Sequence, residues 1–294
     1  MTGAEKGFLL LTSHLGNPHR PVLTTAQFRT LAVRAGQMQM PLEDRDLSAS
    51  DLISLGCSRA MADRILGLFA EEDLLRHYLS RAHRLDCVPI TRVTEQYPGI
   101  LRQRLGPDCP GTLWAKGDLT VLHTPAIALV GSRELNPDNF TFAQAVGRHV
   151  AQQGLTLVSG NARGADRTAQ DACLSAGGKV ISIVADELWK HQYRDNVLYL
   201  SEEDYDSSFT AQRALSRNRC IHALGRMVFV AQSNLEKGGT WDGTARNLHF
   251  GWSPVACFRD GSQASLELEQ MGAYLIGIED LQDFSGLPEQ PTIV

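Results

Sequence analysis

The stretch of sequence that decides the fold is AIALVGSR, residues 126–133. Its first five residues are apolar, which is the pattern of a strand buried on both faces of a parallel sheet. Gly131, Ser132 and Arg133 follow directly. Glycine permits close approach of a ligand, serine offers a hydroxyl, and arginine offers a planar fork for phosphate oxygens. The stretch therefore predicts a buried strand that ends at an anion-binding loop.

Further short apolar runs follow toward the C-terminus and alternate with amphipathic stretches. They cover residues 155–158, 179–184, 227–230, 254–258 and 273–276. Strands separated by helices indicate a doubly wound sheet, whose ligands bind beyond the carboxyl ends of the strands. We therefore expect an α/β, Rossmann-like, mostly parallel sheet over residues 126–294.

The N-terminal part has a different pattern. Residues 1–85 carry apolar side chains at helical spacing and no convincing strand, which predicts a small all-α domain. Within it, LISLGCSRAMA (52–62) resembles a helix-hairpin-helix, which either presents N–H groups to a phosphate or only packs structurally. Residues 86–125 are rich in Pro and Gly and are expected to be a connector and the approach to the sheet.

The composition excludes several classes of protein. With 294 residues, 43% hydrophobic and 21% charged, the chain is neither disordered nor a small disulfide scaffold. Its formal charge of -5 means that binding to a polyanion requires a local basic patch. The six scattered cysteines favour reduced, buried thiols, so we expect no metal and no cofactor. No apolar stretch approaches the length of a membrane span or a signal peptide, so we expect a cytoplasmic protein without membrane contact.

Three more segments are candidates for the anion site. The stretch from Ser159 to Asp166 is a Gly-punctuated loop that contains Arg163 and leads into a helix, whose first N–H groups favour an anion. Residues 209–226 hold four arginines and no acid, and either bind an anion or pair with the acidic stretch 202–206. The third segment precedes another predicted helix and contributes Gly238, Gly239 and Thr240.

The order of these motifs resembles the DNA-processing protein A (DprA/Smf) family. GSR at 131–133 is followed by SG and RGAD, then RNR at 217–219, then Gly-Gly and Gly-Thr-Ala; the upstream YPGIL (97–101) is also similar. The resemblance covers about residues 85–260 well and the helical region loosely. It implies an extended Rossmann-like domain that binds single-stranded DNA without cutting it, commonly as a homodimer. It also implies help in loading a RecA-type recombinase during natural transformation.

Carrying the motifs over residue by residue gives the expected nucleic-acid or phosphate contacts. Together with the loop residues above they are Gly131, Ser132, Arg133, Ser159, Gly160, Arg163, Gly164, Arg217, Asn218, Arg219, Gly238, Gly239 and Thr240. Asp166 aligns with the acid of a family motif and is expected to fix its loop. Gln170 stands where the family has histidine, and the chain is expected to lack the family's C-terminal winged-helix domain. These departures indicate a divergent member that could instead act in phage defence or beside a toxin partner.

Two other functions use the same fold. A sensor of a nucleotide signal, or a module that regulates a toxin, would need the same phosphate-binding loops. A phosphoribohydrolase similar to the lysine-decarboxylase-like LOG proteins would need a glutamate after its PGGxGT motif, where this chain has Asn247. An amide cannot perform the general acid-base step, so we expect no catalytic residue and no enzyme.

Overall fold

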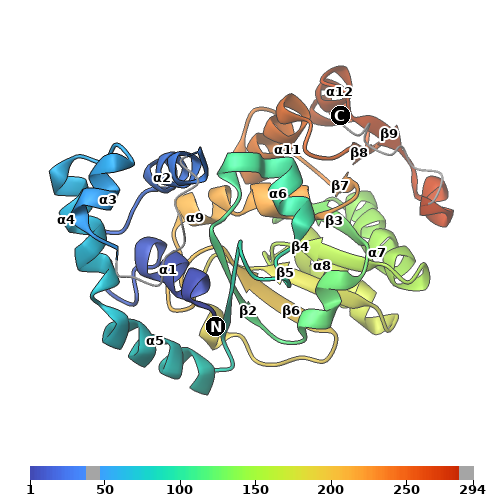
Figure 1. Ribbon diagram of the computed structural model, residues 1–294. Helices are drawn as coiled ribbons and strands as arrows, with labels where there is room; N and C mark the ends of the chain where they lie inside the picture. Colours follow the sequence, from blue (N-terminus) through green and yellow to red (C-terminus); the bar gives the residue numbers. More distant parts are fainter. Residues whose placement is uncertain (38–46, 285–294) are drawn as a thin grey trace.

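The computed structural model describes residues 1–37 and 47–284 (Figure 1). Its described residues form a nine-stranded sheet in the order β1-β2-β6-β5-β4-β3-β7-β8-β9. The strands are β1 (Val88–Thr91), β2 (Thr112–Lys116), β3 (Ala126–Val130), β4 (Thr156–Ser159), β5 (Lys179–Ile183), β6 (Val197–Ser201), β7 (Val228–Val230), β8 (Val255–Phe258) and β9 (Tyr274–Ile276). From β6 to β9 all neighbours are parallel, which confirms the predicted Rossmann-like α/β fold.

Five helices form the described N-terminal part: α1 (Gly3–Thr12), α2 (Thr25–Gln37), α3 (Ala49–Ser54), α4 (Arg59–Phe69) and α5 (Glu72–Arg84). The helices that follow build the layers around the sheet: α6 (Gly99–Leu105), α7 (Pro137–Gln152), α8 (Ala165–Ser175), α9 (Ala211–Ser216), α10 (Asn218–Leu224), α11 (Gly238–Phe250) and α12 (Gln263–Gln270). Strand β3 alternates between the layers: Ile127 and Leu129 share a core with α7, and Ala128 and Val130 share one with α6 and α10. Burial on both faces explains why this strand is apolar throughout.

Three strands were not predicted from the sequence, and two of them lie in residues 86–125, which were expected to be a connector and the approach to the sheet. Strands β1 and β2 lie within that segment and extend the same sheet in the antiparallel sense. Strand β1 is at the edge of the sheet, where Pro89 is tolerated because no inner ladder needs its missing N–H. The third, β6, runs directly into the acidic stretch 202–206.

The N-terminal part is helical in its described residues, α1 to α5, as expected. Helices α3 and α4 form the predicted hairpin around Gly56, whose φ of 79° is in the left-handed region. Arg34 donates to the Gly56 carbonyl at 2.7 Å, which holds α2 against this turn. Residues 38–46 and 285–294, which the predicted domains include, lie outside the described residues.

The acidic stretch after β6 connects these helices to the sheet through hydrogen bonds. Asp204 accepts hydrogen bonds from the Ser13 hydroxyl and the His14 N–H, both at 2.7 Å. Asp206 accepts one from the Tyr78 hydroxyl at 2.6 Å. Figure 1 shows the N-terminal helices in blue at one end of the sheet, far from the red α12 and β9. None of the helices that the structure describes is long and apolar enough to cross a lipid bilayer.

Candidate phosphate-binding site

The sheet order reverses between β3 and β7, because β4 to β6 lie on one side of that pair and β8 and β9 on the other. Doubly wound sheets bind ligands in the crevice at such a point. A cavity of about 560 Å³ lies there, which we call the rim pocket. Its lining includes Gly131, Ser132, Arg133, Asp166, Phe209, Leu215, Arg217, Asn218, Lys237, Gly238, Gly239 and Thr240. Four segments far apart in the sequence therefore meet at one site.

Arg133 is the exposed cation of the rim pocket. It follows β3 and makes no hydrogen bond or ion pair with any other residue that the structure describes. Lys237 also lines the pocket and is exposed, at the start of α11. Neither side chain forms an ion pair within the described part of the chain, although the carboxyl groups of Glu134 and Asp166 also line the pocket.

Arg217 is the buried cation of the rim pocket, with 7% of the residue exposed. Its guanidinium lies against Gly160, where a methyl group would overlap it. Burial lowers the pKa of Arg217, while Asp166 and Glu202 act in the opposite direction. Its Nε is buried without a hydrogen-bond partner among the described residues. Such a desolvated, incompletely bonded guanidinium binds an incoming oxyanion more strongly than one in water.

The start of α11 adds backbone donors to this wall. Lys237 is the N-cap and supplies no side-chain hydrogen bond to the helix, so the first N–H groups are not capped by it. Asn218 donates from Nδ2 to the Gly239 carbonyl at 3.0 Å. The amide of Asn218 thus positions the N-terminus of α11 beside Arg217.

The loops after β3 and β4 are joined to each other. Ala165 N–H donates to the Ser132 carbonyl at 3.1 Å. Gly164 has a φ of 85°, and a side chain on it would collide with the backbone of Arg133. Asp166 accepts a hydrogen bond from the Ala162 N–H at 3.1 Å, and burial raises its pKa despite the nearby Arg217. Asp166 thus accepts a hydrogen bond within its own loop.

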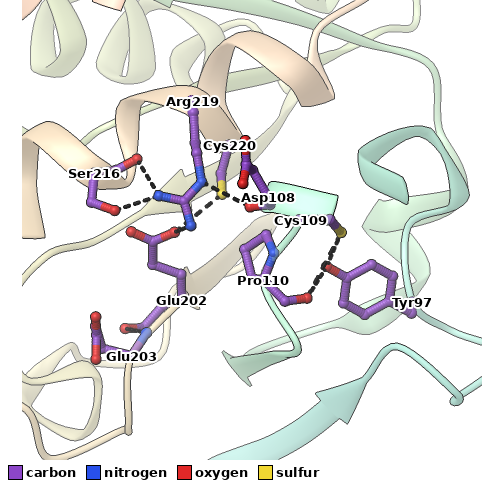
Figure 2. Close-up of polar contacts among 10 residues, drawn as sticks. Tyr97, Asp108, Cys109, Pro110, Glu202, Glu203, Ser216, Arg219 and Cys220 are labelled. Carbon is purple, nitrogen blue, oxygen red and sulfur yellow. Dashed lines mark hydrogen bonds and ion pairs between the residues drawn. The ribbon is translucent and has the colours of Figure 1, made fainter. Parts of the chain in front are cut away.

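Arg219 does not reach the rim pocket, although it was expected there. It forms an ion pair with Glu202 at 2.8 Å and donates to the Asp108 carbonyl at 3.2 Å (Figure 2). Residues two apart on a helix lie about 200° apart, so Arg217 and Arg219 point to opposite sides. That spacing was a signal available in the sequence.

Ser159, Gly160, Arg163 and Gly164 also lie outside the lining of the rim pocket, although all four were expected there. Ser159 is fully buried, and its hydroxyl accepts a hydrogen bond from Gln170 at 2.6 Å. Arg163 is exposed and pairs with Glu134 at 2.9 Å on the ridge formed by the two joined loops. The hydroxyl of Ser159 therefore bonds to another buried side chain, and the guanidinium of Arg163 lies on the outer surface.

The rim pocket also has an apolar wall, on which Leu215 was not among the residues predicted from the sequence. Phe209 and Leu215 line this wall and are 54% and 43% exposed. Exposed aromatic rings are platforms on which nucleic-acid bases stack. The pocket thus has one cationic wall and one apolar wall, which suits a nucleotide unit of phosphate and base.

Metal ligands are not gathered in the described part of the chain. No group of three or more His, Cys, Asp or Glu side chains is placed there so that it could hold an ion. The six cysteines are free thiols, and all but Cys57 are buried. The donors available at the rim pocket are thus guanidinium, ammonium and backbone N–H groups, which bind anions.

Comparison with known proteins places this site in a family. DNA processing protein DprA of Bacillus subtilis is 28% identical over 227 residues, 71% of this chain and 74% of that protein. The crystal structure of DNA processing protein A from Streptococcus pneumoniae has the same fold, with a TM-score of 0.69 at 24% identity over 88% of this chain and 97% of that one. A Helicobacter pylori DNA processing protein A structure, described for its single-stranded DNA binding mode, has a TM-score of 0.55 at 25% identity over 67% of this chain and 93% of that one.

The family itself follows from a match over most of the chain. The model described as DNA recombination-mediator protein A matches residues 89–285, about two thirds of the 294 residues. The match includes the segments that build the rim pocket. This chain therefore belongs to the DNA recombination-mediator protein A family, whose members include the DprA and Smf proteins.

Proposed function

We propose that the protein binds single-stranded DNA in the rim pocket and acts in DNA processing. The observation that carries this proposal is the convergence of Arg133, Arg217 and the start of α11 on one cavity. These groups can contact successive phosphates, while Phe209 offers a surface for a base. Single strands expose both features at once, whereas a duplex hides the faces of its bases. The H. pylori relative described for single-stranded DNA binding supports this choice of ligand.

The finer role that we propose is to help a RecA-type recombinase load onto single-stranded DNA, with the protein acting as a homodimer. The family description, recombination mediator, supports this role. Action in phage defence or beside a toxin uses the same DNA contacts and differs only in the protein partner. Pull-down of the tagged protein with a RecA-type recombinase on single-stranded DNA tests the recombinase role, and failure to retain the recombinase would contradict it.

We propose binding without catalysis because both acids in the lining of the rim pocket already have partners. Glu134 pairs with Arg163 at 2.9 Å. Asp166 is buried and bonded to the Ala162 N–H. Asn247 is also buried, and its side-chain oxygen accepts a hydrogen bond from the Ser253 N–H at 2.9 Å. A phosphoribohydrolase needs a titrating carboxylate at that position, which the amide does not supply. Incubation of nucleoside monophosphates with the protein should release no free base.

Fluorescence anisotropy with labelled oligo-dT and with a panel of mononucleotides tests the ligand. We expect saturable binding of oligo-dT with a log-log salt slope of about -2, since each phosphate contact on a single strand contributes about -0.7. Arg133→Ala should weaken binding about fivefold, whereas Arg84→Ala, on the exposed surface of α5, should not. Binding of a mononucleotide without binding of the oligonucleotide would contradict the proposal and favour a nucleotide sensor.

A further inference from the structure

A second groove lies on the other side of the joined loops, between α7 and α8. Its volume is about 510 Å³, and we call it the outer groove. Its lining is Phe140, Gln144, Arg148, Gly164, Arg167, Thr168, Asp171, Ala172, Ser175 and Ala176. Helices α7 and α8 pack closely because Gly147 has no side chain to separate it from the backbone of Ala169. The groove is thus a fixed surface feature between two tightly packed helices.

The charge of the outer groove is positive, although the protein is acidic as a whole. Arg148 is exposed and has no hydrogen bond or ion pair within the described part of the chain. Arg167 is exposed, and its Nε donates to the Asn161 carbonyl at 3.3 Å. Asp171 is the one acid in the lining, and it lies 4.0 Å from Arg194, which is outside the groove. Two guanidinium groups therefore face an opening that also offers hydroxyl and amide groups.

The outer groove adjoins the rim pocket. Gly164 lines the outer groove and packs against the backbone of Arg133, which lines the rim pocket. Only the two joined loops separate the cavities. On their ridge lies Arg163, paired with Glu134 at 76% and 87% side-chain exposure. Cations at Arg133, Arg163 and Arg167 thus follow one another from the first cavity to the second.

Phe140 marks a further feature of the outer groove. It lies in the first turn of α7 and is 43% exposed, although its neighbour Phe142 is fully buried. An exposed ring beside two arginines is the combination that single-stranded nucleic acids use, since bases stack on the ring and phosphates pair with the cations. The two arginines against one acid in the lining also match the negative charge of a phosphate backbone.

We infer that the strand leaving the rim pocket crosses the ridge at Arg163 and continues along the outer groove. There, Arg148 and Arg167 contact its phosphates, and Phe140 stacks a base. This inference rests on the proposed function, because it concerns the continuation of the same bound strand. It predicts a site for single-stranded DNA that is longer than the rim pocket alone.

The test compares two lengths of oligo-dT, about 6 and about 20 nucleotides, one near the lower end of common site sizes and one beyond their upper end. The double variant Arg148→Gln/Arg167→Gln should bind the long strand at least about tenfold more weakly and the short strand as the unaltered protein does. Its salt slope on the long strand should become shallower by about 1.4, since two phosphate contacts are lost. Phe140→Ala should weaken only the long complex, about fivefold.

The matched control is Arg76→Gln/Arg84→Gln, which removes two exposed arginines from α5. It should change neither complex, and melting curves should show that both double variants are folded. Equal affinity of the groove variant and the control for the long strand would overturn the inference while leaving the proposed function intact. If the groove variant changes its oligomeric state but binds DNA as before, the inference would also be overturned. The outer groove would then bind a second copy of the chain and not DNA. Absence of binding to either length by the unaltered protein would overturn both proposals.

Discussion

Arg217 and Arg219 are two residues apart, yet they belong to different regions of the molecule. Arg217 forms the floor of the rim pocket and has a buried Nε without a partner. Arg219 belongs to what we call the buried cluster, in which it contacts Glu202, Ser216 and Asp108 beneath α10 (Figure 2). A guanidinium whose N–H groups donate to protein acceptors stabilises the fold, whereas one with an N–H group that lacks an acceptor can bind a ligand. The position of an arginine in a motif therefore does not identify its role.

The largest effect on stability is expected from Arg219→Ala. Burial lowers the pKa of the Arg219 guanidinium, but the negative groups around it, Glu202 foremost among them, together raise that pKa above its ordinary value. Removing this partner leaves the carboxylate of Glu202, 4% exposed, without its counter-charge. We expect a loss of about 3 kcal/mol in the free energy of unfolding, measured by urea denaturation. A fully stable variant with lost DNA binding would place Arg219 in the rim pocket instead.

Arg217→Gln should produce the complementary result. We expect the affinity for oligo-dT to fall by about 2 kcal/mol, since a charge-assisted contact to phosphate is lost. Because glutamine keeps much of the volume over Gly160, the loss of stability should be smaller than that of Arg219→Ala. Isothermal titration and urea denaturation measure the two effects separately. Unchanged affinity would remove Arg217 from the binding site.

His222, on the buried side of α10, should make stability depend on pH. Burial lowers the pKa of His222 to about 3, and neither ring nitrogen has a hydrogen-bond partner among the described residues. The unfolded chain takes up this proton near pH 6.5, so the contribution of His222 is complete above that value and is lost as the pH falls toward 3. By pH 5 the loss should be about 2 kcal/mol. Urea denaturation of His222→Leu should show a flatter profile, and an identical profile would contradict this explanation.

The smallest effect is expected from Ser159→Ala. The Ser159 hydroxyl accepts a bond from Gln170, which also approaches the Ser182 hydroxyl at 3.4 Å. Because Gln170 retains this second partner, the loss of stability should be about 1 kcal/mol. Affinity for oligo-dT should stay unchanged. A clear loss of affinity at full stability would move Ser159 from the interior to the binding surface.

The central strands and the meeting of the loops were predictable from the sequence. Continuous apolar runs such as 126–130 fit a strand that is buried on both faces, and parallel strands bring their carboxyl ends to one rim. Strand β1 was not predictable in this way, since Pro89 and four residues give no periodic signal. Its position depends on pairing with β2, a contact between residues far apart in the sequence.

The directions of individual side chains were harder to predict than the loops that carry them. The motif RNR suggested two equivalent arginines, but helical geometry turns them to opposite sides. Ser159 is the last residue of β4, and its side chain is in the interior because the pleat alternates at every residue. The apolar wall at Phe209 depends on the placement of α9 over the rim, which no local pattern specifies.

The attachment of the N-terminal helices has a consequence for shortening the protein. A fragment that begins after residue 85 would lose the donors Ser13 and Tyr78, and with them the hydrogen bonds that hold Asp204 and Asp206. The same stretch of chain leads within a few residues to Phe209 and α9, on the wall of the rim pocket. Removing the helices would therefore loosen one wall of the pocket as well as uncover the sheet.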